Sequence, residues 1–184
     1  MKKLFFCALF FLFMGLVSNA QRWAVGTNLV DYANFGTLNL EGSVAVERHW
    51  SLDMEWDYNP WTYKAGSSDQ FQNRSLSSSL GTRYWPWHVY AGWWFRSSIQ
   101  YQIYNRGGLL QESAEEAEAY GAGIAFGYAL LLGERVNVDF GFGLWGGMKE
   151  YTIYRCTNCG RITEQGTKWF MLPDDISLAF YFIF

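Results

Sequence analysis

Long apolar runs and clustered basic residues are both missing from this sequence, and each absence narrows the class of protein. Beyond the N-terminus there is no run of the roughly 20 apolar residues that a transmembrane helix needs, so any membrane crossing requires a closed barrel of strands. The net charge is −3 and no basic patch is visible. Nucleic acid is therefore not expected as a partner.

Lysine is also scarce. After Lys2 and Lys3, it occurs at Lys64, Lys149 and Lys168, all in segments that we expect to be loops or loop edges. A soluble β protein normally carries lysines along its solvated strand faces. The distribution therefore favours strands whose outer faces do not meet water.

The N-terminus has the layout of a secretory signal peptide. A charged start at residues 1–3 is followed by an apolar run over residues 4–17 and by Ser18-Asn19-Ala20, which predicts cleavage after Ala20. Residues 21–184 then suit a single domain. Cys7 lies inside the apolar run, where it does not indicate a lipoprotein, and we assign it no function.

The C-terminal residues alternate in a way that predicts the closing strand of an outer-membrane β-barrel. Period-two alternation places Ile176, Leu178, Phe180, Phe182 and Phe184 on one face of a strand, and lipid is the expected cover for that face. We expect the terminal Phe184 to act as the C-terminal assembly signal. Aromatic residues make up 20% of the chain, with ten tryptophans, which is typical of the interfacial belts of membrane barrels.

Eight alternating segments predict an all-β, eight-stranded, antiparallel, up-and-down transmembrane barrel. Each is close to the roughly 9–11 residues that a tilted strand needs to cross a bilayer. Short turns alternate with longer connections at residues 59–74, 105–119 and 147–173, as in barrels with short periplasmic turns and longer external loops. The short link Asn34-Phe35 is the one exception. The segments are residues 22–33, 36–47, 50–58, 75–85, 89–104, 120–132, 135–146 and 174–184.

The two faces of these segments differ in polarity. In residues 50–58 one face is apolar and the other carries Ser51, Asp53, Glu55 and Asp57. A narrow eight-stranded barrel is filled by side chains, and charges buried there need partners. We therefore predict that the two arginines of an interior charge network pair with some of its acids. The members of this network are Glu41, Asp53, Glu55, Asp57, Arg83, Arg96 and Asp139.

A wide pore is not expected, because small residues from Gly121 to Ala129 share the interior face of their strand. The rival fold is a soluble lipocalin-like barrel, which follows the same alternation with an apolar interior. It would expose Glu41, Asp53 and Asp139 to water without supporting lysines and would leave Phe184 unexplained. We therefore prefer the membrane barrel.

The last long connection contains Cys156-Thr157-Asn158-Cys159. Two cysteines at this spacing can form a local disulfide, stay as free thiols, act as a redox pair or supply half of a zinc site. We favour a disulfide or free thiols in an exported loop, since His49 and His88 lie in turns at the opposite end of the barrel. The metal alternative stays open.

Catalysis is not expected. A hydrolase at the outer face needs a base beside a nucleophile, and neither histidine falls in an external loop. We expect no cofactor.

Residues 111–119 are acidic and favour helix, which predicts a solvated helix within the third external connection.

Five short motifs follow one another along the chain: Gly26-Thr27-Asn28-Leu29, Tyr58-Asn59-Pro60-Trp61, Arg83-Tyr84-Trp85, Tyr120-Gly121-Ala122-Gly123 and the Cys156 to Cys159 loop. Together they resemble domain-of-unknown-function family 3575, small exported proteins of Bacteroidota. The resemblance covers nearly the whole mature chain and carries no catalytic residue, because the family has no established activity. It implies a link to fimbrial components, since relatives occur near fimbrial assembly genes.

These observations together predict a monomeric protein of the cell outer membrane. Its expected role is structural, or the binding of a surface or fimbrial protein partner through the external loops. The alternative is a narrow channel or a small-ligand-binding barrel, either in the membrane or as a soluble lipocalin-like protein. An outer-face hydrolase is the third hypothesis.

Overall fold

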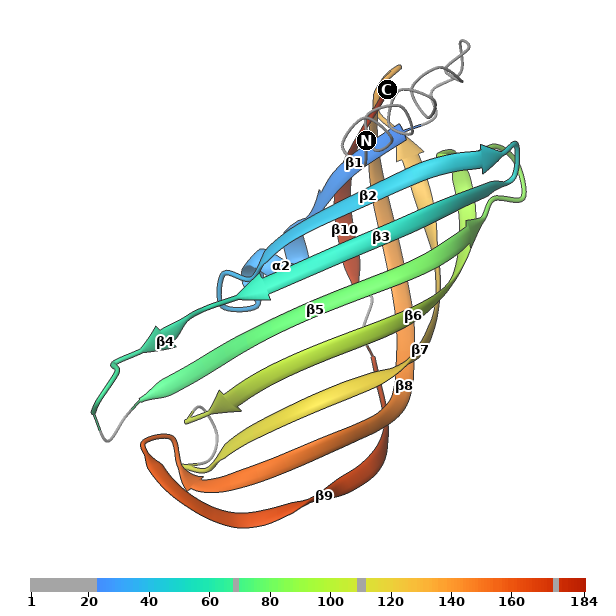
Figure 1. The fold of residues 1–184 in the computed structure, drawn as a ribbon. Helices are drawn as coiled ribbons and strands as arrows, with labels where there is room; N and C mark the ends of the chain where they lie inside the picture. The colour runs from blue at the N-terminus through green and yellow to red at the C-terminus, as the bar shows by residue number, and fades with distance from the viewer. Residues whose placement is uncertain (1–22, 68–69, 109–111, 174–175) are drawn as a thin grey trace, which may run out of the picture.

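The fold is given by a computed structural model that describes residues 23–67, 70–108, 112–173 and 176–184. Ten strands and one short helix make up this part of the chain (Figure 1). The predicted signal peptide and Cys7 lie outside the described residues. The elements are β1 (Trp23–Asn28), α2 (Leu29–Ala33), β2 (Leu38–Glu47), β3 (Trp50–Asn59), β4 (Thr62–Tyr63), β5 (Phe71–Tyr84), β6 (Gly92–Gly107), β7 (Ala114–Leu131), β8 (Val136–Cys156), β9 (Cys159–Pro173) and β10 (Ser177–Ile183).

The strands form one antiparallel sheet that closes on itself. Apart from β4 and β9, eight strands follow the order β10-β1-β2-β3-β5-β6-β7-β8, and the additional pairing of β10 with β8 completes the ring. Neighbours in the chain are neighbours in the ring, so the predicted all-β, antiparallel, up-and-down arrangement with eight strands is confirmed. Among the described residues, no helix is long and apolar enough to cross a membrane.

The two ends of the ring differ. The tight connections β2–β3, β5–β6 and β7–β8 lie at one end, beside the start of β1 and the end of β10 (Figure 1). We call this the turn end. At the opposite loop end lie α2, β4 and the hairpin in which β9 pairs with the outer half of β8, from Leu144 to Cys156.

The side chains alternate between the inside and the outside of the ring, as the sequence predicts. On β3 the inward Asp53 is 5% exposed, whereas the outward Leu52 is 43% exposed. At the turn end a small apolar core consists of aromatic side chains such as Trp85 and Trp94, several alanines and Ile183. The ring is thus polar over most of its interior and apolar over most of its outer surface.

The first predicted strand, residues 22–33, is wrong at its end. Residues Leu29–Ala33 form α2, because the side chain of Asn28 accepts a hydrogen bond from the backbone N–H of Val30 and caps the helix. The chain then turns through positive φ angles at Phe35 and Gly36, which delays the start of β2 to Leu38.

The predicted helix in residues 111–119 is also wrong. From Ala114 onward the chain is the first part of β7, and Ala117 and Ala119 are buried while Glu116 and Glu118 are exposed. Local helix propensity is a weak preference, and here the pairing of residues 114–119 with both β6 and β8 outweighs it.

The external connections are shorter than predicted because the strands continue into them. Residues 147–156 extend β8 and residues 159–173 form β9, so the expected long loop is a hairpin with Lys149 and Lys168 in its strands. Strand β5 already begins at Phe71, and β6 continues to Gly107. At the turn end, in contrast, β6 starts only at Gly92, after a turn in which Tyr90 has a φ of 69°.

Candidate binding site inside the ring

Arg83 on β5 is the centre of a buried charge cluster. Its Nη1 donates a 2.9 Å hydrogen bond to Oδ2 of Asp139 on β8, and its Nε lies 3.4 Å from Oδ2 of Asp53 on β3. All three side chains are almost fully buried. Two carboxylates facing one guanidinium inside a ring need this close geometry, because charges removed from water are stable only when paired.

Aromatic side chains complete this cluster. The Arg83 guanidinium carbon lies 4.3 Å from the ring centroid of Trp94, and Tyr181 on β10 donates its hydroxyl hydrogen to the carboxylate of Glu41 on β2. Trp94 fits because Gly127 faces it: a Cβ atom built on Gly127 would lie 2.3 Å from Cζ2 of the indole. Sequence reasoning missed Trp94 and Tyr181, although both fall on the inward side of the alternation.

Arg96 forms a second cluster closer to the loop end. Its Nη1 lies 3.2 Å from Oε2 of Glu55, and its Nη2 donates a 2.6 Å hydrogen bond to the hydroxyl of Ser79. Ser79 in turn donates to the same oxygen of Glu55 at 3.2 Å. The two arginines therefore pair with Asp53, Asp139 and Glu55 of the predicted network, and together they fill the middle of the ring.

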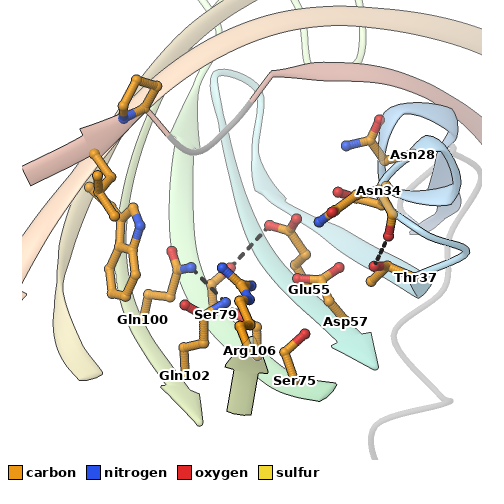
Figure 2. Close-up of a pocket in the computed structure, with 15 residues that line it drawn as sticks. Asn28, Asn34, Thr37, Glu55, Asp57, Ser75, Ser79, Gln100, Gln102 and Arg106 are labelled. Atoms are coloured by element: carbon orange, nitrogen blue, oxygen red, sulfur yellow. Dashed lines mark hydrogen bonds between the residues drawn. The ribbon is translucent and has the colours of Figure 1, made fainter. Parts of the chain in front are cut away.

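Above the two clusters, toward the loop end, lies a polar cavity of about 240 Å³ (Figure 2). Glu55 and Asp57 reach it from β3, and Arg106 reaches it from β6. The opposite wall is apolar. The full lining is Asn28, Asp31, Asn34, Thr37, Glu55, Asp57, Ser75, Ser77, Ser79, Gln100, Gln102, Arg106, Trp145, Leu172 and Pro173.

Neutral hydrogen-bonding groups line the floor and one side of this cavity in register. Ser79 pairs with Gln100 and Ser77 with Gln102 across the β5–β6 ladder, and all four side chains point inward. Gln100 Nε2 donates to the Ser77 hydroxyl at 3.4 Å. Alternate residues of neighbouring strands share a face, which explains why serines and glutamines two residues apart converge here.

Three carboxylates face this neutral side. Oxygens of Asp31, Glu55 and Asp57 lie within 4.8 Å of one another. Asp31 was not expected there, because the sequence placed it in a strand, whereas α2 turns it over the loop end of the cavity. Arg106 lines the same cavity and brings positive charge beside these acids.

A second, wider cavity of about 520 Å³ lies at the mouth and shares Asn34 and Arg106 with the inner one. Lys149 forms an ion pair there with Glu115, which also accepts a 2.6 Å hydrogen bond from the Tyr104 hydroxyl. Partial burial raises the pKa of Glu115, but the hydrogen bonds from Lys149 and Tyr104 outweigh it and hold the pKa below its ordinary value. Burial and Glu115 raise the pKa of Tyr104.

The family model described as "Protein of unknown function (DUF3575)" matches residues 5–184, essentially the whole chain. The chain belongs to the DUF3575 family. No curated protein and no solved structure shows a significant match. The family description assigns no activity, so the arrangement of the side chains carries the functional argument for this DUF3575 protein.

In the part of the DUF3575 chain that the structure describes, Cys156, His49 and His88 do not line the cavity. Cys156 is disulfide-bonded, and its backbone pairs with that of Cys159 at the tip of the β8–β9 hairpin. His49 and His88 lie in turns at the other end, where His49 Nδ1 is 2.8 Å from the carbonyl oxygen of Trp85. Within the described residues, the candidate metal ligands that cluster in threes are Asp31, Glu55 and Asp57.

Proposed function

We propose that this DUF3575 protein is a β-barrel of the bacterial outer membrane that presents its loop end to a binding partner at the cell surface. The observation that carries the proposal is the contrast between the two faces of the ring. Charged side chains are buried inside, whereas leucine, isoleucine and aromatic side chains cover the outside. Lipid is the solvent in which such an outer surface is stable.

The outward residues of three neighbouring strands support a lipid-facing belt. Ile99, Ile124 and Phe126 are each more than half exposed, and Ile124 pairs directly with Leu144 on β8. Nearer the loop end, Glu118 pairs with Glu150, and both side chains are exposed. Two like charges directly opposite each other belong in water, so the belt ends below this pair.

The part of the ring above the belt supports a surface role. Strands β8 and β9 continue past the Glu118 and Glu150 pair to a hairpin tip at residues 156–159, and residues 160–169 of β9 are exposed. Asn158 donates a hydrogen bond to the carbonyl of Ser67, which joins the hairpin to the β4–β5 connection. We propose that this hairpin contacts the partner, with a fimbrial or adhesion component as the expected kind.

Fractionation tests the barrel. The protein is expected in the outer-membrane fraction, with a gel mobility that changes on boiling, because a closed barrel resists detergent until heated. An epitope tag inserted at Asn158 should be labelled on intact cells, whereas a matched insertion at Gly133 in the β7–β8 turn should not. Soluble protein without a mobility change would revive the lipocalin-like alternative.

Deletion of residues 155–167 tests the partner-binding role. The shortened protein should keep its heat-dependent mobility and lose the surface proteins that cross-link to the full chain on intact cells. An unchanged set of cross-linked proteins would overturn the assignment to the hairpin. The Gly133 insertion serves as the control for general damage to the barrel.

Small-ligand binding is the second candidate function, and the polar cavity favours it over conduction. The Arg83 and Arg96 clusters fill the ring beneath the cavity. The cavity is therefore closed on the side of the turn end and does not form a channel through the ring. The protein is expected to be silent in planar bilayers. Conductance that changes in an Arg96→Ala variant would instead support the narrow-channel alternative.

A further inference from the structure

We propose that the inner cavity binds one neutral sugar ring, either a free hexose or the terminal residue of a glycan. This inference rests on the proposed ligand-binding function and names its ligand class. The cavity in Figure 2 combines neutral donors and acceptors, carboxylates and an apolar wall. Each of these matches one part of the surface of a pyranose.

Sugar hydroxyls act as donors and as acceptors at once, so a site for them needs both kinds of group at close range. The amides of Gln100 and Gln102 and the hydroxyls of Ser77 and Ser79 supply both. The carboxylate of Asp57 accepts, and the guanidinium of Arg106 donates. Because these groups sit on paired strands, the site is held by a rigid scaffold.

The opposite side of the cavity suits the carbon-bound face of a sugar ring. Trp145, Leu172 and Pro173 line it, and the Trp145 indole is held by an edge contact with Phe170 at 4.5 Å between ring centroids. A pyranose presents C–H groups on its faces and hydroxyls around its rim. An apolar wall opposite a polar one can therefore contact both parts of the same ring.

Charge argues against a cation or an anion as the ligand. Glu55 already pairs with Arg96, and Arg106 stands beside the remaining carboxylates, so an incoming cation meets a guanidinium within the same cavity. An anion such as a phosphate meets Asp31, Glu55 and Asp57. A neutral polyol avoids both repulsions.

Size limits the ligand to one ring. The cavity of about 240 Å³ is below the roughly 300–1,000 Å³ typical of sites for drug-sized ligands. The mouth cavity shares Asn34 and Arg106 with it and is also lined by the aromatic residues Phe35, Phe71 and Tyr104. These rings could contact the next units of a glycan whose end occupies the inner cavity.

The test uses the full mature chain, folded in detergent, with saturation-transfer NMR and calorimetry. The probes are D-glucose, D-galactose, D-mannose and N-acetyl-D-glucosamine, and a glycan array distinguishes a glycan end from a free sugar. L-Lysine, spermidine, Ca²⁺ and inorganic phosphate serve as charged comparators. Heat-dependent gel mobility is recorded on every preparation, so that a failed barrel is distinguished from an empty cavity.

Two substitutions place the binding in the cavity. Gln102→Leu and Ser77→Ala should each weaken binding by about two- to twelvefold, the loss expected for one hydrogen bond between uncharged groups. The matched controls are Gln165→Leu on the exposed face of β9 and Ser78→Ala, the neighbour of Ser77 that points outward. The controls should bind like the wild type.

Binding of a neutral sugar that is weakened only by the cavity substitutions would support the inference. A folded barrel that binds no sugar, or that binds sugars equally well in all variants, would overturn it. Binding of a charged comparator in the cavity would overturn the ligand class while keeping the broader ligand-binding function. A protein without heat-dependent mobility would overturn the barrel proposal itself.

Discussion

Arg83 on β5 donates a 2.9 Å hydrogen bond to Asp139 on β8, although these two strands are not neighbours in the ring. The contact crosses the interior and joins residues that are 56 positions apart in the sequence. This side-chain contact braces the ring from inside, whereas backbone hydrogen bonds connect only adjacent strands. The first prediction follows from this brace.

Replacing Arg83 with methionine should destabilise the barrel strongly. The substitution leaves Asp53 and Asp139 buried without their guanidinium, and losing one member of a buried pair costs roughly 3–5 kcal/mol. Urea unfolding followed by gel mobility measures the effect. The double variant Arg83→Met with Asp139→Leu should recover part of the loss, and Arg74→Met on the exposed face of β5 is the control. Unfolding of Arg83→Met at the wild-type urea concentration would refute the brace.

A second prediction concerns the packing of Trp94. Gly127→Val should prevent or slow closure of the ring, because a Cβ at this position would meet the indole at 2.3 Å and the Phe140 carbonyl oxygen at 2.2 Å. Overpacking of this kind typically costs about 1–3 kcal/mol. Gly133→Val is the control, since a Cβ there meets nothing within 4 Å. Equal yields of heat-modifiable protein from both variants would contradict the close fit of Trp94.

The third prediction is a pH dependence at the mouth. The pKa of Glu115 is held below its ordinary value, so its ion pair with Lys149 contributes stability that is present above the unfolded-state pKa and is lost as the pH falls through the folded-state pKa. The loss should therefore begin below about pH 4.3, the ordinary value for glutamate. Limited proteolysis of the loop end, followed from pH 6 downward, measures it.

The control for this pH dependence is a matched pair of glutamine variants. Glu115→Gln removes the titrating group and should flatten the acid-dependent change, whereas Glu112→Gln, on an exposed residue, should retain it. Proteolysis that rises equally in both variants as the pH falls would show that another group is responsible.

The general fold was predictable from the sequence, because period-two alternation is a local signal that repeats along each strand. The alternation in residues 50–58 identified both the strand and its inward face, and with it Asp53 and Glu55 as partners available to the arginines. The first and last residues of the strands were less predictable. Where β7 and β8 extend beyond the alternating segments, cross-strand pairing decides the structure, and no local pattern reports it.

The candidate cavity was harder to foresee than the charge network. Gln100, Gln102 and the serines of β5 carry no individual signal, since polar residues on an inward face are equally consistent with simple filling. Asp31 was misplaced because the cap at Asn28 converts the end of a strand-like segment into a helix. What gathers these residues is the closure of the ring, which depends on contacts far apart in the sequence.

The charge cluster also has a consequence for the order of assembly. Glu41 bonds to Tyr181, a residue 140 positions later, and Arg83 lies within 3.4 Å of the same hydroxyl across 98 positions. Until β10 joins the ring, both early charges lack this partner, and pairings this distant form slowly. A chain halted before β10 would contain seven of the eight ring strands, and the ring would stay open between β1 and β8. The buried charge cluster is therefore complete only after β10 has joined the ring.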